Sequence, residues 1–432
     1  MKIVVFGAGP IGLVTSLSLV IWGHDVLCVD TNQNLIEELA QGRTVLHEAG
    51  LQTELTRALA DNKIQFTCEL SQTFNFSDVY FITVGTPNNI DGSSDLTSFN
   101  KCVSNIVNAN TSEKKIIVIK STVQPKTNVI LTEKYKNKNV IFISNPEFLR
   151  EGQALTDALN PDRIVIGCND TLAIEMLMQI YKPLATKTQF FTTDPTTAEI
   201  SKYAANTFLA AKISLINEFS KITAGFGGDI QTVSKIVGAD QRIGSDFLNS
   251  GLGFGGSCFP KDLKALQHQA AQSDIQLPMI SAIETINQQQ HLRFVHLILK
   301  TISKKILCIW GISFKPETND LREASALKII DILLENNFTI HVHDPELAPE
   351  FSKIYSDPIA NNKIVIFNDA YTALKKCSAL AICTEWNLYK TADLQKIRTE
   401  LENPVIFDGR NIFQNEHIIN TDLKYFTLGS NL

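Results

Sequence analysis

The sequence predicts an α/β protein with two doubly wound, parallel-sheet domains joined by a long central helix. Three observations support this prediction. Short apolar runs alternate with helical stretches at both ends of the 432-residue chain. Both ends open on the same plan: a strand, a loop, a helix and a second strand that closes on an aspartate. Between them, residues 196–224 show no strand signal and place apolar or small side chains at helical spacing.

The first domain is predicted to span residues 1–194. Its short apolar runs lack a helical period, which indicates buried strands. Helical stretches separate most of these runs, and this alternation is typical of a parallel sheet with helices on both faces. The predicted strands cover residues 2–6, 26–30, 79–84, 115–120, 139–143 and 163–166.

The character of the chain changes at Pro195. A helical connector is predicted over residues 195–303, and a second, smaller α/β domain over residues 304–432. The connector helices are predicted at residues 196–224, 228–238, 262–273 and 279–302. The last domain is predicted to contain a helix at residues 322–336 and strands at residues 305–310, 338–343, 363–367, 378–382 and 404–407.

The composition excludes several classes of protein. Hydrophobic residues make up 44% and charged residues 19%, which excludes a disordered chain. The net charge of -6 and the absence of a basic block argue against a nucleic-acid partner, although an anionic small substrate stays open. The apolar stretch after Lys2 resembles a signal peptide, but Gly7, Gly9 and Gly12 interrupt it. No run approaches the roughly 20 apolar residues that span a bilayer, so no membrane partner is expected.

The eight cysteines contain no C-x-x-C pair, and their spacing fits neither a zinc site nor a disulfide framework. Most lie in apolar runs, as Cys28 does, which predicts small buried side chains in a reducing compartment and hence a cytoplasmic protein. His341 and His343 alternate on a predicted strand without a third ligand nearby, so no metal is expected.

The first chemical motif is Gly7-x-Gly9-x-x-Gly12, between a predicted strand and helix. Such glycines allow a tight turn and the close approach of a pyrophosphate to the helix N-terminus, as in Rossmann-like domains. Asp30 closes the next strand 18 residues further on, where a carboxylate fits a free ribose 2′-hydroxyl and repels a 2′-phosphate. The motif therefore predicts NAD rather than NADP; a glycine-rich packing turn is the alternative.

The second motif is the segment GFGGSCFPKD, residues 253–262. Its glycines predict a close approach of the backbone to a ligand. Cys258 is followed by a helix predicted to start near Lys261 or Asp262, and a helix N-terminus with a nearby lysine favours the thiolate. A thiolate can attack an aldehyde or acyl carbon, and Asp262 could hold a water. A lone cysteine is more often structural, but the flanking glycines and the Lys-Asp pair favour chemistry here.

Lys202 and Asn206 are four residues apart on the long predicted helix and therefore share one face. If that face is buried, the lysine can donate to an oxyanion. A solvent-exposed stripe is the open alternative.

Three further motifs follow predicted strands of the first domain, where the ligands of a parallel sheet gather. They are Gly85-Thr86-Pro87, Ser121-Thr122 and the segment NPEFLREG at residues 145–152. In the last domain, a loop with Lys315 and Arg322 is predicted to hold a phosphorylated ligand or to be a solvated basic loop.

Together these segments resemble the UDP-glucose/GDP-mannose dehydrogenase family over essentially the whole chain. The matching segments are GAGPIG, VGTP, STV, NPEFLREG, PDRIVIG, EISKYAANTFLAAKISLINE, DQRIG, GFGGSCFPKD, GISFKPETNDLRE and DGRN. The resemblance implies an N-terminal NAD domain, a long helix that carries a dimer contact and a C-terminal UDP-binding domain. It therefore implies NAD as cofactor, UDP-glucose as substrate and at least a homodimer.

The resemblance also implies a four-electron oxidation of the sugar at C6. Cys258 would capture the intermediate aldehyde as a thiohemiacetal, a second hydride transfer would give a thioester, and water would release UDP-glucuronate. Carried over by motif, Lys202 and Asn206 stabilise the oxyanion and Asp262 orients the water. Glu147 is an acid/base, together with Thr122.

Further positions match the ligand contacts of the family. The substrate side is matched by Glu147, Phe148, Leu149, Lys202, Asn206, Phe254, Gly255, Lys315 and Arg410, and by Arg242, which in the family reaches the neighbouring subunit's substrate. The cofactor side is matched by Gly7, Gly9, Ile11, Gly12, Asp30, Gly85, Thr86, Pro87, Ser121, Thr122, Glu151, Lys261 and Arg322. The chain departs from the family pattern at Leu35, Asn319 and His343, none of which touches the expected chemistry.

Three alternatives stay open. A two-electron hydroxy-acid dehydrogenase also combines a glycine-rich domain with a Lys-x-x-x-Asn helix, but it needs neither a nucleophilic cysteine nor a third domain. A silent NAD-binding regulator would be expected to have lost Cys258, Lys202 or Asp262, and all three are present. The substrate could be another nucleotide sugar, GDP-mannose or a UDP-N-acetylhexosamine; residues 240–244, DQRIG, favour UDP-glucose on resemblance alone.

Overall fold

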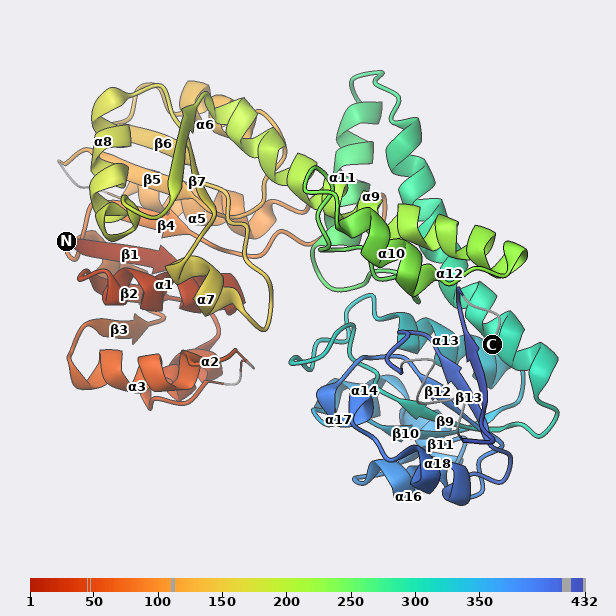
Figure 1. Cartoon of the computed structure of the whole chain (residues 1–432). Coiled ribbons are helices and arrows are strands. Elements are labelled where there is room, and N and C mark those ends of the chain that lie inside the picture. The colour runs from red at the N-terminus through yellow and green to blue at the C-terminus, as the bar shows by residue number, and fades with distance from the viewer. Residues whose placement is uncertain (45, 47, 110–112, 414–420, 430–432) are drawn as a thin grey trace. The chain divides into compact units, whose positions relative to one another are not determined.

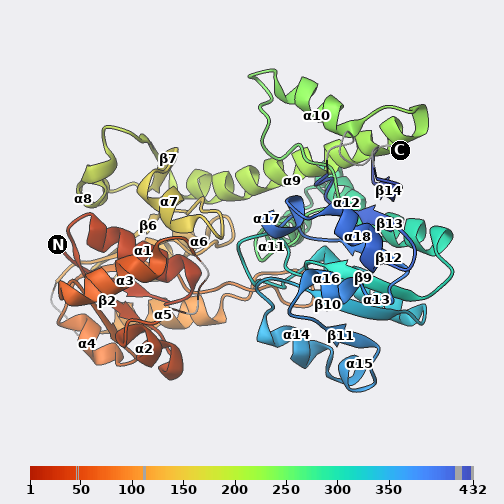
Figure 2. The same ribbon diagram turned by 60° about the horizontal axis from the view of Figure 1, so that its bottom comes forward.

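The structure, a computed structural model, describes residues 1–44, 46, 48–109, 113–413 and 421–429 (Figure 1). The chain divides into two compact units. Unit 1 contains Met1–Ala205 and Lys264–Asp274, and unit 2 contains Asn206–Leu263 and Ile275–Leu432. The 32-residue helix α9 (Pro195–Phe226) runs from the first unit into the second and is seen along its length in Figure 2. The predicted fold class is confirmed, whereas the bounds of the three predicted domains stay predictions.

Unit 1 is built on an eight-stranded sheet in the order β3-β2-β1-β4-β5-β6-β7-β8. The strands are β1 (Lys2–Phe6), β2 (Asp25–Val29), β3 (Ile64–Thr67), β4 (Val79–Ile82), β5 (Lys115–Ile119), β6 (Val140–Ser144), β7 (Arg163–Gly167) and β8 (Gln189–Thr193). The order reverses between β1 and β4, which is where ligands bind in sheets of this type. The glycine motif follows β1 at this point.

One pairing differs from the predicted parallel sheet, because β6 and β7 pair antiparallel, Ser144 opposite Gly167. The other neighbouring pairs, from β3 to β6 and from β7 to β8, are parallel. The last residues of β6 and β7 lie opposite each other, so β7 starts beyond the carboxyl end of β6 and runs back toward it. Asn145 Nδ2 donates to the Val165 carbonyl at 2.8 Å, which places the start of the NPEFLREG segment beside β7.

Helices cover both faces of this sheet. They are α1 (Pro10–Ile21), α2 (Gln33–Ala40), α3 (Leu51–Ala60), α4 (Leu70–Phe74), α5 (Thr97–Asn108), α6 (Thr127–Lys134), α7 (Ala154–Leu159), α8 (Thr171–Ile180) and the short η1 (Lys182–Leu184). Alternate strand residues point to opposite faces. Val5 accordingly belongs to the apolar core that includes Leu13 of α1, and Val4 to the core that includes Phe99 of α5.

Unit 2 holds a six-stranded parallel sheet in the order β11-β10-β9-β12-β13-β14. Its strands are β9 (Ile306–Trp310), β10 (Thr339–His343), β11 (Ile364–Ile366), β12 (Ala379–Ile382), β13 (Val405–Asp408) and β14 (Lys424–Thr427). Its sheet helices are α13 (Ser325–Glu335), α14 (Pro349–Ile354), α15 (Ser356–Ala360), α16 (Ala370–Leu374), α17 (Asn387–Lys390) and α18 (Leu394–Glu400). The order again reverses, here between β9 and β12.

Three helices of the predicted connector complete the chain: α10 (Ile230–Gly238), α11 (Phe259–Ala271) and α12 (Pro278–Thr301). Helix α11 starts two to three residues earlier than predicted, so that Cys258 directly precedes it. None of the eight cysteines, all of which lie in the described residues, forms a disulfide. Within the described residues, no helix is both long and apolar enough to cross a membrane.

Candidate active site

The glycine motif forms a tight turn between β1 and α1. Gly7 has a positive φ of 101°, which favours glycine. A Cβ on Gly12 would lie 1.7 Å from the Gly7 carbonyl oxygen, so α1 passes against the loop only with glycine at this position. Beside Gly9, by contrast, a Cβ would meet nothing within 4 Å. The turn therefore leaves open space at the helix N-terminus, where Pro10 begins α1 and Ile11 follows.

Asp30 lies directly after β2 and ties the strand end to the glycine loop. One carboxylate oxygen, Oδ2, accepts a hydrogen bond from the Ala8 amide at 2.7 Å, and Oδ1 accepts one from the Asn32 amide at 2.9 Å. A carboxylate can accept about four hydrogen bonds, so capacity is left for a ribose hydroxyl. The open helix N-terminus and this carboxylate fit the pyrophosphate and ribose of NAD.

The loops after β4 and β5 are bonded to each other at the same edge of the sheet. Thr86 donates from Oγ1 to the Thr122 carbonyl at 2.8 Å, and Ser121 donates from Oγ to the Val84 carbonyl at 2.7 Å. The predicted cofactor-side motifs, including Gly85 and Pro87, thus lie on two neighbouring strand ends. In unit 2, Asp344 repeats the role of Asp30, with Oδ2 accepting from the Ile312 amide at 2.7 Å.

A buried ion pair joins the NPEFLREG segment to α9. Lys202 Nζ lies 3.0 Å from Glu147 Oε1, and both side chains are buried. Burial would raise the pKa of Glu147, but Lys202, the Leu149 amide at 2.6 Å and the charge of Lys120 outweigh it and hold that pKa below its ordinary value. Lys202, on the predicted Lys202–Asn206 face of α9, is therefore paired with the Glu147 carboxylate. Because Lys202 and Asn206 are both buried, the alternative of a solvent-exposed stripe is excluded.

Two cationic groups lie near the ring of Phe148. The Arg163 guanidinium is 3.9 Å from the centre of its ring, and Lys202 Nζ is 5.6 Å away. Leu149 packs at the margin of the larger core of unit 1, and Glu151 is half-buried on the same segment. The segment that the sequence singled out is thus fixed by charge and packing on both sides of Glu147.

Sequence reasoning missed Lys120, the residue that follows β5 directly. Its Nζ donates to Asn145 Oδ1 at 3.2 Å and to the Tyr181 hydroxyl at 3.3 Å. Burial lowers the pKa of Lys120 to about 8, with the Lys202 charge adding to the effect and Glu147 opposing it. Lys120 directly precedes the Ser121-Thr122 motif, and this position in the sequence could have identified it.

Sequence reasoning also missed Glu199, which lies one turn before Lys202 on α9. It is buried, and its Oε1 accepts hydrogen bonds from the Asn128 amide at 2.9 Å and Ser144 Oγ at 3.1 Å. It lines a pocket together with Lys202 and Thr122. Its i, i+3 spacing to Lys202 was a signal, but spacing alone does not tell a buried carboxylate from an exposed one.

In unit 2, Cys258 is exposed, the one exposed thiol among the eight cysteines. It precedes α11, and its carbonyl accepts the first-turn hydrogen bond from the Asp262 amide at 2.9 Å. Asp262 is buried, with 1% of its surface exposed. Its Oδ2 accepts a hydrogen bond from Asn206 Nδ2 and its Oδ1 one from Lys261 Nζ, both at 2.6 Å. Asp262 therefore links Asn206 of α9 to the helix that follows the thiol.

The glycines before Cys258 serve the protein's own packing. A Cβ on Gly255 would lie 2.4 Å from the Glu323 carbonyl oxygen, and one on Gly256 would lie 2.7 Å from the Phe314 ring. The prediction that these glycines bring backbone to a ligand is therefore untested, because the close approach seen is between two loops. Next to them, Phe254 is held at both backbone groups by Asn287, through bonds of 2.7 and 2.9 Å.

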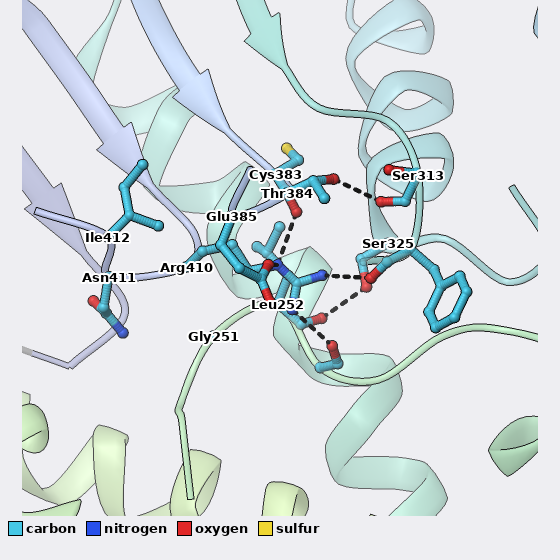
Figure 3. Close-up of polar contacts among 12 residues, drawn as sticks. Gly251, Leu252, Ser313, Ser325, Cys383, Thr384, Glu385, Arg410, Asn411 and Ile412 are labelled. Carbon is cyan, nitrogen blue, oxygen red and sulfur yellow. Dashed lines mark hydrogen bonds and ion pairs between the residues drawn. The ribbon is translucent and has the colours of Figure 1, made fainter. Parts of the chain in front are cut away.

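Arg410 follows β13 and bonds three other segments of unit 2 (Figure 3). Its Nε donates to the Cys383 carbonyl at 2.8 Å and lies 3.3 Å from Glu385 Oε2. Nη1 donates to the Gly253 carbonyl at 3.3 Å and Nη2 to the Phe314 carbonyl at 3.4 Å. This guanidinium thus connects the loop before Cys258 with the loops that follow β9 and β12.

The three other cationic candidates have contacts of their own. Arg242 pairs with Asp240 at 2.6 Å and keeps 89% of its side chain exposed. Arg322 pairs with Asp320 at 2.6 Å and is also exposed. Lys315 is half-buried, with Nζ 5.4 Å from the centre of the Phe314 ring.

Comparisons with known proteins agree with this arrangement. Models of the UDP-glucose/GDP-mannose dehydrogenase family match three stretches: its NAD binding domain residues 1–185, its central domain residues 196–289 and its UDP binding domain residues 308–415. The chain belongs to this family. It is an NAD-dependent dehydrogenase with an NAD-binding domain and a UDP-binding domain.

Relatives in this family extend over nearly the whole chain. A UDP-glucose 6-dehydrogenase of Pseudomonas aeruginosa is 36% identical, over 96% of this chain and 94% of its own. One of Rickettsia felis is also 36% identical, over 100% of this chain and 97% of its own. A solved UDP-glucose dehydrogenase of Pyrobaculum islandicum has a TM-score of 0.90 at 31% identity, over 100% of this chain and 98% of its own.

Proposed function

We propose that this dehydrogenase oxidises UDP-glucose at C6 to UDP-glucuronate through a covalent intermediate on Cys258. The observation that carries the proposal is the exposed Cys258 thiol at the start of α11, next to the buried Asp262–Asn206 pair. The names of the 36% identical relatives support UDP-glucose as the substrate. The overall change is UDP-glucose, two NAD⁺ and one water to UDP-glucuronate, two NADH and three protons.

The residues of unit 1 bind the cofactor and handle the first proton. The glycine loop and Asp30 hold the pyrophosphate and the ribose, as argued above. NAD, when bound, accepts the hydride from C6. The C6 hydroxyl loses its proton to the Glu147–Lys202 pair, with Thr122 beside it. When Glu147 takes this proton, the Lys202 ammonium, which Glu147 otherwise compensates at 3.0 Å, compensates the charge of the C6 oxygen instead.

The residues of unit 2 carry the covalent step. The Cys258 thiolate adds to the C6 aldehyde and forms a C–S bond, and the carbonyl oxygen becomes the alkoxide of a thiohemiacetal. Lys202 and Asn206 donate to this oxyanion. After the second hydride has left C6 as a thioester, a water oriented by Asp262 attacks the acyl carbon. The C–S bond then breaks, and the thiolate and UDP-glucuronate are released.

We further propose that the substrate's UDP end is held by Phe254, Gly255, Lys315 and Arg410, and that Arg242 acts on the site of a neighbouring subunit. Support for a homodimer comes from α9, where Phe208, Leu215 and Phe226 expose 71%, 58% and 89% of their surface on one face. The lack of disulfides among the eight cysteines favours a reducing compartment, the cytoplasm.

A second candidate substrate is a UDP-N-acetylhexosamine. It is favoured by a solved UDP-N-acetyl-mannosamine dehydrogenase of Staphylococcus aureus, which has a TM-score of 0.81 at 25% identity, over 99% of this chain and 98% of its own. The test is a panel of nucleotide sugars offered with NAD, in which NADH formed per sugar consumed is counted. We expect that, of the sugars in the panel, only UDP-glucose gives two NADH per sugar consumed. One NADH per sugar would contradict the four-electron reaction, and preference for another sugar would contradict the substrate.

A further inference from the structure

A small pocket lies in unit 1 beside Lys202, at the carboxyl ends of β5 and β6. Its lining includes Thr122, Ser144, Glu199 and Lys202. Two of these residues, Lys202 and Thr122, belong to the proposed reaction. Its free space has room for about one ordered water molecule.

Glu199 is the unexplained member of this lining. Only 4% of its surface is exposed, and its Oε1 is fully engaged by the Asn128 amide and Ser144 Oγ. Its other oxygen, Oε2, is buried and has no hydrogen-bond partner among the described residues. A buried carboxylate oxygen without a partner is costly, so this oxygen needs a proton, a water or both.

The charges around Glu199 permit a neutral carboxyl. Burial raises the pKa of Glu199 to about 7, against the opposing hydrogen bonds from the Asn128 amide, Ser144 and the start of α6. The charged groups on the neighbouring elements are Lys202 on α9, Lys120 after β5, Glu147 after β6 and Lys126 before α6. Lys202 is paired with Glu147 at 3.0 Å, so its charge is already compensated.

We propose that Glu199 is a positioning residue that takes up protons from Lys202 through one water molecule held in the pocket. The proposal rests on the proposed function, because it needs a reaction that releases protons at Lys202. In the step, the Lys202 ammonium gives a proton to the water while the water gives one to Glu199 Oε2. One N–H bond and one water O–H bond break, and one water O–H bond and one carboxyl O–H bond form. Lys202 is left as the amine that can accept the next substrate proton.

The competing role for Glu199 is purely structural. Its Oε1 accepts from Asn128, in the first turn of α6, and so caps this eight-residue helix. Glu199→Gln separates the two roles. The glutamine oxygen can still accept from the Asn128 amide and Ser144, but the amide cannot take up or release a proton near neutral pH.

The experiment is the pH profile of kcat for NADH formation from UDP-glucose and NAD, from about pH 5 to about pH 9. We expect Glu199→Gln to lose one ionisation from the profile and to lower kcat about tenfold near neutral pH, with KM for both ligands nearly unchanged. Asp78→Asn is the matched control, because burial also raises the pKa of that carboxyl, and it lies before β4 at the opposite edge of the same sheet. This control should keep the wild-type profile. If Glu199→Gln keeps the wild-type pH profile, Glu199 serves only to cap α6, and the proposal is overturned.

Two further experiments distinguish failure of this proposal from misfolding of the variant and from failure of the proposed function. If Glu199→Gln does not fold, Ser144→Ala removes one donor to the Glu199 carboxyl and should move the same ionisation to higher pH; no movement would overturn the proposal. If the wild-type protein does not oxidise UDP-glucose, the proposed function fails. The Glu199 titration is then read by infrared difference spectra between about pH 5 and about pH 8. A carboxyl band that is lost in Glu199→Gln supports the proton-holding site, and the absence of such a band overturns it.

Discussion

Glu147 and Lys202 form a buried ion pair that depends on contacts between distant segments of the chain. Neither side chain has appreciable contact with water, and each compensates the charge of the other at 3.0 Å. From the sequence, a buried lysine with a pKa depressed by desolvation was one of two predictions. The structure adds the partner, which residue spacing could not supply because Glu147 lies 55 residues earlier on a different element. Lys120 and Glu199 were missed for the same reason, since their importance depends on burial against other segments.

We expect Lys202→Met to destabilise unit 1 by about 3–5 kcal/mol at neutral pH, because it leaves the Glu147 carboxylate buried without its main partner. In the wild type, the pKa of Glu147 is held below its ordinary value of 4.5, so the pair's stabilisation is present above that value and lost as the pH falls. In the variant, burial dominates and raises that pKa, so the loss of stability should shrink as the pH falls toward about 4 to 5.

Thermal unfolding of the wild type and Lys202→Met at about pH 5 and about pH 8 measures this difference. Lys63→Met is the control, because Lys63 pairs with Asp25 at 2.7 Å but both side chains are more than 40% exposed. It should change stability little at either pH. A Lys202→Met protein as stable as the control variant at about pH 8 would show that Lys120 alone compensates Glu147.

The covalent mechanism predicts the result of removing one sulfur atom. We expect Cys258→Ser to lower turnover by several orders of magnitude, because a serine hydroxyl is not appreciably ionised at neutral pH and forms the adduct poorly. Binding of UDP-glucose and NAD should persist, since the glycine loop, Asp30 and the UDP-binding domain are unchanged. Steady-state NADH formation together with calorimetric binding of both ligands tests this.

Cys28→Ala and Cys308→Ala are the controls for that experiment. Both thiols are fully buried in apolar cores, so their removal should lower stability and leave the chemistry intact. Near wild-type formation of UDP-glucuronate by Cys258→Ser would rule out the thiohemiacetal.

At the scale of elements, apolar runs predicted the central strands and missed three peripheral ones. β3 and β8 contain polar residues such as Gln65 and Thr192, and β8 lies at the edge of its sheet with mostly exposed or half-buried residues. β14 also alternates buried and more exposed residues at a sheet edge. The direction of β7 was wrong as well, because strand order and direction depend on pairing between distant segments, which a local pattern does not contain.

The turn between β1 and α1 predicts different effects for two of its glycines. In Gly12→Ala the added Cβ would lie 1.7 Å from the Gly7 carbonyl, so α1 must move away from the loop. We expect unit 1 to lose stability by about 1–3 kcal/mol or more, and NAD binding to be lost with it. In Gly9→Ala the Cβ meets open space, so stability should be unchanged while the methyl group hinders the pyrophosphate.

Thermal unfolding and NAD titration of both variants check this pair. We expect Gly12→Ala to be less stable than Gly9→Ala, and NAD affinity to fall in both variants. If the two variants are equally stable, α1 can move away from the loop without lowering the free energy of unfolding. Unchanged NAD affinity in Gly9→Ala would place the pyrophosphate away from the open side of this turn.

At the scale of the whole molecule, α9 carries an apolar face that the described residues of the chain leave exposed. Phe208, Leu215, Phe219, Ile222 and Phe226 each expose at least 43% of their surface. At 100° per residue they fall within one narrow stripe, about 27 Å long at 1.5 Å per residue. An apolar stripe of this length is typical of a protein interface. The sequence predicted it from helical spacing, but only the structure tells which apolar residues of α9 are covered within the chain.

We therefore expect the protein to be at least a homodimer by light scattering, and Leu215→Lys to weaken the dimer because the lysine would place a charge in the apolar stripe. Leu172→Lys is the control, since Leu172 is 74% exposed but belongs to α8 and not to the α9 stripe. It should leave the mass unchanged. A wild-type protein that is monomeric at assay concentration would contradict the dimer.

The assignment of Arg242 to a neighbouring subunit allows a sharper test by complementation. Arg242 keeps 89% of its side chain exposed and touches Asp240 of its own chain, which fits a residue that acts outside its own subunit. Arg242→Ala and Cys258→Ser proteins are each expected to be nearly inactive. In a mixed dimer, the chain that keeps Cys258 would receive Arg242 from its partner, so one of the two sites is restored. Random mixing makes about half of the dimers mixed, so about one quarter of wild-type activity should return. If Arg242 acted in its own subunit, every site would lack one residue and mixing would restore nothing.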